Sequence, residues 1–155
     1  MTRAMVRRRS ASPGRVELLD VEFAPPPDPA VAMRRIAAEA LILQDEAEAV
    51  LADVARGEHL GRVAPRGGPL VRRFFALADA VPPAVACPDP ADRRTADTLR
   101  TILTHHAMQV STALDFLAVA WRSERLADHV RRISGLGEPA LILERLYRDL
   151  IHRDG

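Results

Sequence analysis

Apolar residues recur at helical spacing in the first long segment of the chain. Asp28 and Pro29 predict a helix start, because a carboxylate caps free N–H groups and proline fits the first helical position. Residues 30–56 contain no glycine or proline, and Gly57 is typical of a helix end. The apolar positions in this segment follow spacings of three and four: Met33, Ile36, Ala40, Leu43, Ala47, Val50 and Val54. The pattern predicts one helix with a single buried side.

Glycine and proline interrupt the next part of the chain. Residues 57–69 contain four glycines and two prolines, which is typical of a loop. The apolar residues of 70–80 share one face and predict a short helix. Further prolines within 82–90 predict a second irregular stretch.

The longest stretch without glycine or proline is 91–134, and Asp89-Pro90 precedes it as a second helix start. One continuous helix here would extend about 66 Å, against about 40 Å for the first helix, at 1.5 Å per residue. Alternatively, the segment breaks around Arg122 to Glu124, and Ser123 caps a separate helix that ends at Ser134. After two glycines, Glu138-Pro139 predicts the start of a last helix.

The beginning of the chain differs in character from the rest. Residues 1–15 hold five arginines and no acidic residue, which predicts disorder. Val16 to Phe23 alternates apolar and acidic positions, as expected of an extended arm that lies on the helical body or pairs with a second copy. We therefore expect a basic tail and arm over 1–27 and one helical domain over 28–155. The predicted fold class is all-α: an antiparallel bundle of four to five helices with an extended, partly disordered N-terminal arm.

Composition narrows the chemistry that this domain can perform. All 22 basic residues are arginine, and the absence of lysine excludes a Schiff-base lysine and the lysine of a phosphate-binding loop. Asparagine is also absent, a bias typical of a GC-rich bacterial genome. Aromatic residues make up only 4% of the chain, so we expect a core of aliphatic side chains.

Charge and hydropathy indicate a cytoplasmic protein. From Val16 onward, 21 acidic residues outnumber 17 arginines, so only the tail, with Arg7, Arg8 and Arg9, suits a salt-dependent contact with nucleic acid or another anion. The longest uncharged run, 101–114, is too short to span a membrane, and the start of the chain lacks the apolar run of a signal peptide.

Two adjacent histidines are the first candidates for function. His105 and His106 lie in the middle of an apolar segment, and adjacent helical residues point about 100° apart, so both cannot bind one ion. We expect His106 to be a core histidine with one hydrogen bond. The functional alternative pairs His105 or His106 with Glu39 or Glu46 from the first helix.

Asp115 is a further candidate, because a carboxyl group among apolar neighbours can act as a proton donor. The simpler interpretation keeps this side chain at the solvent-exposed edge of its helix. A di-iron bundle needs two Glu-x-x-His motifs, and only Asp149, three residues before His152, resembles one. The sequence therefore predicts no metal site and no cofactor.

Charged residues on predicted helices suggest where partners bind. Arginines and acids alternate over 122–132, which predicts a solvated helix face with internal ion pairs. If this face were an interface, its complement would be the acidic residues spaced seven apart on the first helix: Glu39, Glu46 and Asp53.

No motif in the sequence names a reaction, and the long apolar seams favour a non-enzymatic interaction or regulatory protein. The unequal helix lengths and the arm predict a homo-oligomer, or a protein partner bound through helix faces. The alternative hypothesis is a helical enzyme or small-ligand-binding protein, with a pocket around His106 and Asp115 that also includes Glu39 and Trp121.

Overall fold

The computed structural model describes residues 28–153 of the 155-residue chain, and this part is all-α as predicted. Two short 3₁₀ helices, over Ala84–Ala86 and Ala120–Arg122, accompany the α-helices. The α-helices are α1 (Pro29–Ala55), α2 (Leu60–Ala80), α3 (Pro90–Val119), α4 (Glu124–Arg131) and α5 (Glu138–His152). The predicted arm and the arginines of the predicted tail lie outside the described residues.

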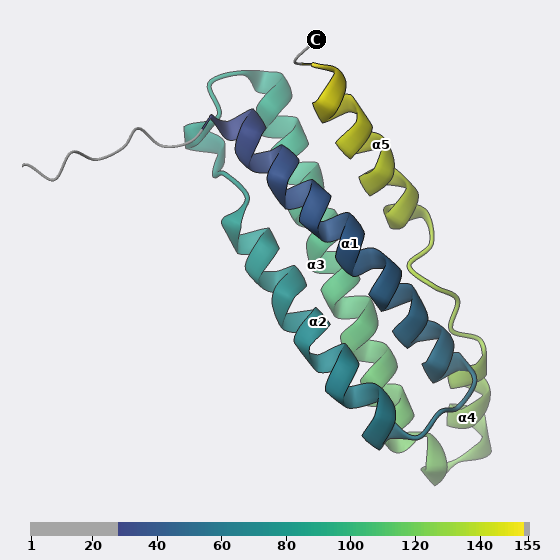
Figure 1. Ribbon diagram of the computed structural model, residues 1–155. Coiled ribbons are helices and arrows are strands. Elements are labelled where there is room, and N and C mark those ends of the chain that lie inside the picture. The colour runs from purple at the N-terminus through teal and green to yellow at the C-terminus, as the bar shows by residue number, and fades with distance from the viewer. Residues whose placement is uncertain (1–27, 154–155) are drawn as a thin grey trace, which may run out of the picture.

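The long helices form the predicted antiparallel bundle (Figure 1). α1, α2 and α3 succeed one another in opposite directions, and α5 returns along α1 and α3. The most extensive contact joins α2 to α3. The short α4 lies at the end of the bundle where α1 and α3 end (Figure 1), so the chain turns there before α5 begins.

The predicted apolar seam of α1 forms the centre of the core. All seven of its residues are buried, and they pack against buried residues of the other long helices. The predicted helix starts are also confirmed, because the carboxylates of Asp28 and Asp89 accept the N–H groups of Ala30 and Ala91, each at 2.8 Å. Local sequence signals therefore define where α1 and α3 begin and which side of α1 is buried.

The loop predicted over 57–69 is wrong, because α2 already begins at Leu60. His59 caps this helix: its Nδ1 atom accepts the N–H of Gly61 at 3.1 Å. Gly67 is buried, and a Cβ atom there would lie only 2.8 Å from Cδ1 of Leu114 on α3. Glycine thus allows α2 to approach α3 closely, and this packing outweighs the low helix propensity of the segment.

The long segment 91–134 breaks at the position given by the second alternative. α3 ends at Val119, and the Ser123 hydroxyl accepts the N–H of Leu126 at 3.2 Å as the cap of α4. α4 ends at Arg131, three residues before the predicted end. Because α3 is about 45 Å long and α1 about 40 Å, the large overhang expected from one continuous helix is not formed.

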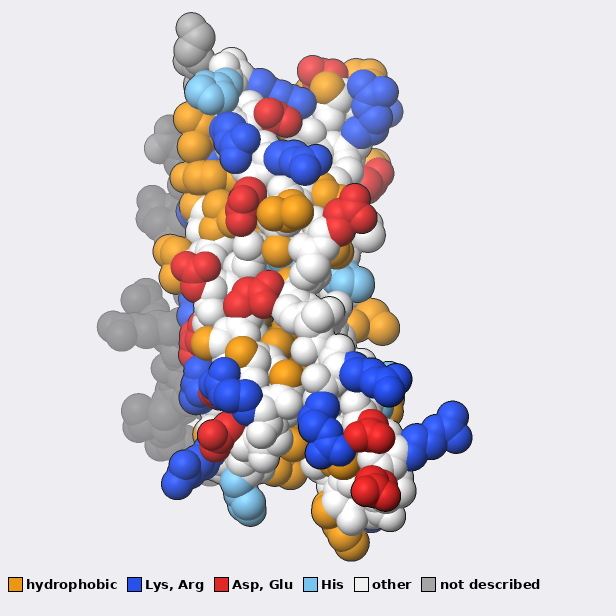
Figure 2. Space-filling view, turned by 90° about the vertical axis from the view of Figure 1, so that its right-hand side faces the viewer, with side chains coloured by type: hydrophobic (Ala, Val, Ile, Leu, Met, Phe, Trp, Pro, Cys, Tyr) orange, Lys and Arg blue, Asp and Glu red, His pale blue; other side chains and the backbone are white. Residues whose placement is uncertain are grey.

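The surface of the bundle carries arginine and acidic side chains interspersed with apolar ones (Figure 2). Within residues 28–153, no helix combines the length and the apolar character that crossing a membrane requires.

Candidate functional site

His106 is a core histidine, as the simpler interpretation predicted. Its side chain is fully buried, and its Nε2 atom lies 3.3 Å from Oε1 of Gln44 on α1. The ring of Phe74 packs edge-on against the imidazole, with 5.4 Å between the centroids. Burial, with a smaller contribution from His105, lowers the pKa of His106 to about 4. The imidazole is therefore neutral at physiological pH.

The structure pairs His106 with Gln44 and places the predicted carboxylates elsewhere. Glu39 accepts a hydrogen bond from Arg73 on α2 at 2.8 Å, and Glu46 and Asp115 are exposed to solvent. These side chains are not assembled around the buried imidazole, so the geometry does not provide the pocket that was expected around His106 and Asp115.

Two of the three acidic residues predicted to form one side of α1, Glu39 and Asp53, have arginine partners within the chain. Asp53 accepts a hydrogen bond from Arg66 at 2.5 Å and also pairs with Arg56, while Glu39 pairs with Arg73. Within the chain, the arginines that pair with Glu39 and Asp53 across helices therefore come from α2 and not from 122–132. On α4 itself, Arg131 pairs with Asp128 at 2.5 Å, which agrees with the predicted ion-paired helix face.

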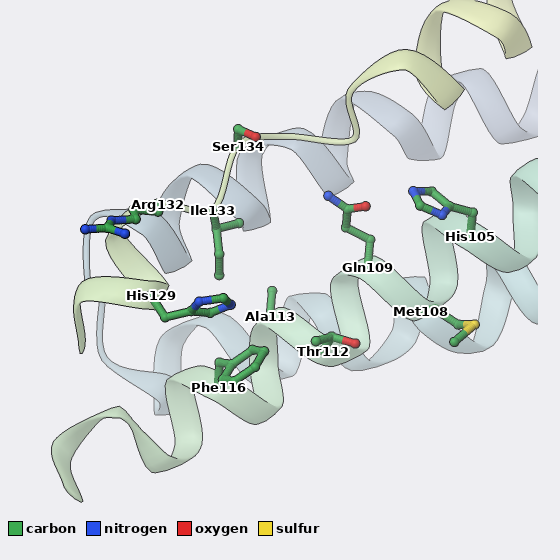
Figure 3. Close-up of a pocket in the computed structure, with 10 residues that line it drawn as sticks. All are labelled: His105, Met108, Gln109, Thr112, Ala113, Phe116, His129, Arg132, Ile133 and Ser134. Carbon is green, nitrogen blue, oxygen red and sulfur yellow. The ribbon is translucent and has the colours of Figure 1, made fainter. Parts of the chain in front are cut away.

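A cleft of about 460 Å³ lies between α3 and the connection from α4 to α5 (Figure 3). Such a volume is typical of small-molecule sites. Its lining combines one row of α3 residues with residues of α4 and of the connection: His105, Met108, Gln109, Thr112, Ala113, Phe116, His129, Arg132, Ile133 and Ser134.

Two hydrogen bonds hold the connection in place as one wall of the cleft. The Gln109 side chain donates from Nε2 to the carbonyl oxygen of Gly135 at 2.7 Å. The N–H of Leu136 donates to Oε1 of Glu48 on α1 at 2.8 Å, and the Leu136 side chain is buried in the core. The connection is therefore fixed from α3 and from α1, although it is not part of a helix.

The inner surface of the cleft has an apolar side. The rings of Phe116 and His129 are stacked at a tilt of 48°, with 4.5 Å between their centroids, and the Ile133 side chain points toward α3 (Figure 3). Met108 also lines the cleft, and 57% of its surface is exposed. An apolar group of a ligand would remove these side chains from water.

The ionisable side chains of the cleft are all of the basic types. His105, His129 and Arg132 line it, and none of the ten lining residues is an aspartate or glutamate. A guanidinium carries its charge throughout the biological pH range, and an imidazole donates a hydrogen bond in either protonation state. This combination suits a negatively charged group.

A second hollow adjoins the cleft along α3, beside the first turns of α5. His105 also lines this neighbouring hollow of about 390 Å³ between α3 and α5, where Ile102, Pro139 and Ile142 provide apolar walls and Asp97 contributes a carboxylate. The two hollows share His105 and therefore adjoin each other. Two adjoining hollows suit a ligand with a chain attached to its charged group.

Sequence reasoning identified one of the residues of this cleft. His105 was a candidate, whereas His129, Arg132 and Phe116 were not. The signal available for these residues was the predicted break at Ser123. A chain that reverses direction there brings the residues after 123 back alongside α3. Among the described residues, histidine, cysteine, aspartate and glutamate side chains form no group of three or more that could hold a metal ion.

Comparison of the chain with protein-family models, with curated proteins and with solved structures finds no match.

Proposed function

We propose that this chain is a non-enzymatic binding protein that takes a small amphipathic anion in the cleft between α3 and the α4–α5 connection. The observation that carries the proposal is the lining itself: His105, His129 and Arg132 line one cleft together with an apolar wall, and none of its lining residues is a carboxylate. The proposed binding site lies on the side of α3 that carries His105, whereas the adjacent His106 is buried in the core.

The ligand class follows from the two kinds of surface in the cleft. Arg132 offers a planar set of donors for a carboxylate, phosphate or sulfate group, and the two imidazoles add further donors. Phe116 and Ile133 would cover an alkyl or aryl part. The adjoining hollow between α3 and α5 provides room for a chain that extends beyond the first cleft.

The same lining favours binding over acid–base catalysis. A histidine that acts as a general base is commonly oriented by a third group, often a carboxylate. His129 stacks on Phe116, and no acidic residue lines the cleft to orient it. Recognition of an anion needs only the donors and the apolar wall that are present.

The test is a titration of isotope-labelled protein with octanoate and octyl sulfate, followed by amide chemical shifts. The matched control ligand is octyltrimethylammonium, which has the same chain and the opposite charge. We expect both anions to shift the amides around 105–116 and 129–136, and the cation to bind at least about tenfold more weakly, as the loss of a charged hydrogen bond implies.

Two variants separate the cleft from general surface charge. Arg132→Gln should weaken octanoate binding severalfold, whereas Arg125→Gln, an exposed arginine of α4 that does not line the cleft, should leave it unchanged. Equal binding of the anions and the cation, or shifts confined to other parts of the chain, would show that the proposal is wrong.

A further inference from the structure

A separate hollow of about 660 Å³ lies at the end of the bundle, where the α1–α2 connection faces the end of α3 and α4. We call it the end hollow. Leu60 and Gly61 form one side, Leu117, Ala118 and Trp121 form another, and Val130 contributes from α4. The end hollow shares no lining residue with the anion cleft.

Trp121 stands at the edge of the end hollow with 80% of its surface exposed. Its indole is nevertheless fixed, because Nε1 donates to the carbonyl oxygen of Ala118 at 3.1 Å. The Arg122 guanidinium lies 5.4 Å from the ring centroid. A large aromatic side chain that is already oriented loses little conformational freedom on binding, which is typical of an interface anchor.

The structure therefore places a protruding apolar side chain beside an apolar hollow on one patch. In a twofold dimer the same patch of both copies meets, so each copy supplies both features. From this juxtaposition, we propose that the end hollow binds Trp121 of a second copy of this chain, and that the second copy's hollow receives Trp121 in return.

The charges around the end hollow favour a second copy over a partner of one charge sign. Arg56 pairs with Asp53, and Arg131 pairs with Asp128, while Glu58 lines the hollow as well. A twofold contact brings a patch against itself, so a patch with a large net charge would repel its own copy. This patch carries both signs, and the two arginines that line the hollow pair with acidic residues of their own copy, which keeps that repulsion small.

The available area indicates a weak dimer. A tryptophan side chain buries on the order of 200 Å², so two copies of Trp121 supply about a third of the roughly 1,200 Å² at the lower end of specific interfaces. The walls of the two hollows must supply the remainder. We therefore expect dissociation in the micromolar range.

Trp121 is the only tryptophan of the chain, so its emission reports directly on this contact. The full-length protein is diluted from about 200 μM to about 1 μM, and its mass is measured by sedimentation velocity together with its emission maximum. We expect a dimer that dissociates on dilution, with a shift of the emission to longer wavelength over the same concentrations.

Three variants test the location of the contact. Ala118→Glu places a charge at the exposed wall of the hollow and keeps Trp121, so it should abolish the dimer and leave the helical circular dichroism unchanged. Trp121→Ser should do the same. Ile42→Ser, at an exposed apolar residue of α1, should leave the dimer unchanged.

A monomer at every concentration would overturn the proposal. So would a dimer that persists in Ala118→Glu, or one whose dissociation leaves the tryptophan emission unchanged. The anion cleft and the end hollow share no lining residue, so Ala118→Glu should still bind octanoate. The anion-binding proposal and the dimer proposal are therefore tested separately, and failure of one leaves the other testable.

Discussion

The Nε2 atom of His106 lies 3.3 Å from Oε1 of Gln44, so a buried imidazole of α3 and a buried amide of α1 are in contact across the core. Because the amide oxygen is an acceptor, the imidazole donates from Nε2, and Nδ1 carries a lone pair. Among the described residues, that Nδ1 atom has no hydrogen-bond partner. The contact therefore gives Nε2 a hydrogen-bond partner, whereas Nδ1 is removed from water without one.

This pair makes the stability of the bundle depend on pH. Burial lowers the pKa of His106 to about 4, whereas an unfolded histidine titrates near 6.5. The unfolded state therefore binds the proton first, and stability is lost as the pH falls from about 6.5 toward 4. The full loss from this group is on the order of 3 kcal/mol. Urea unfolding between pH 7.5 and pH 4.5 measures it.

The matched variant replaces both partners, His106→Leu with Gln44→Leu, so that no buried polar group is left unpaired. We expect this protein to be at least as stable as the natural chain at pH 7.5 and to lose less stability at pH 4.5. His152→Gln, at an exposed histidine at the end of α5, should keep the pH dependence of the natural chain. If the free energy of unfolding fell equally with pH in the natural chain and in the double variant, His106 would not be the source of the pH dependence.

Gly67 of α2 lies directly against Leu114 of α3, and this gives a second prediction. Gly67→Leu should destabilise the protein by about 1–3 kcal/mol through overpacking, since even a Cβ atom would lie 2.8 Å from Leu114. Gly68→Ala has ordinary space around it and should stabilise the protein by up to about 1 kcal/mol. Adding Leu114→Ala to Gly67→Leu should restore part of the loss; additive effects of the two changes would show that they do not meet.

The same pair explains which part of the fold the sequence could predict. Helix starts at Asp28 and Asp89, the cap at Ser123 and the seam of α1 follow from residues that are close in sequence. The start of α2 depends instead on Gly67 fitting against Leu114, 47 positions further along the chain. Glycine and proline were correct signals of low helix propensity, but tertiary packing outweighed them.

The candidate site was less predictable because its parts come from different elements. His105 was visible as an unusual polar residue on an apolar segment. Arg132 and Ile133 enter the cleft only because Gln109 and Glu48 hold the α4–α5 connection beside α3. Neither hydrogen bond follows from a local sequence pattern, because both join residues that are distant in the sequence, 88 positions apart in the second case.

Proline within α2 leads to a third prediction. Pro65 and Pro69 lie inside the helix and are exposed, and each lacks the N–H that would bond to the carbonyl oxygen four residues earlier. Pro65→Ala should therefore stabilise the protein by about 1–2 kcal/mol, the gain in helix propensity being offset partly by a more flexible unfolded chain. Thermal unfolding checks this, with Pro82→Ala, outside the helix, as the control. A lower melting temperature for Pro65→Ala would mean that the proline is needed where it stands.

Glu48 holds the wall of the cleft, and its removal gives the last prediction. In Glu48→Ala the partly buried N–H of Leu136 loses its acceptor, which should cost about 1–3 kcal/mol. The connection should also become more mobile, so amide hydrogen exchange should accelerate at 133–137 and octanoate should bind more weakly.

Gly135→Ala should act similarly, because a Cβ atom there would collide with the Glu48 carboxylate. Glu46→Ala removes an exposed carboxylate from the same helix and should change neither property. If Glu48→Ala exchanged no faster than Glu46→Ala, the wall would be held by the burial of Leu136 alone.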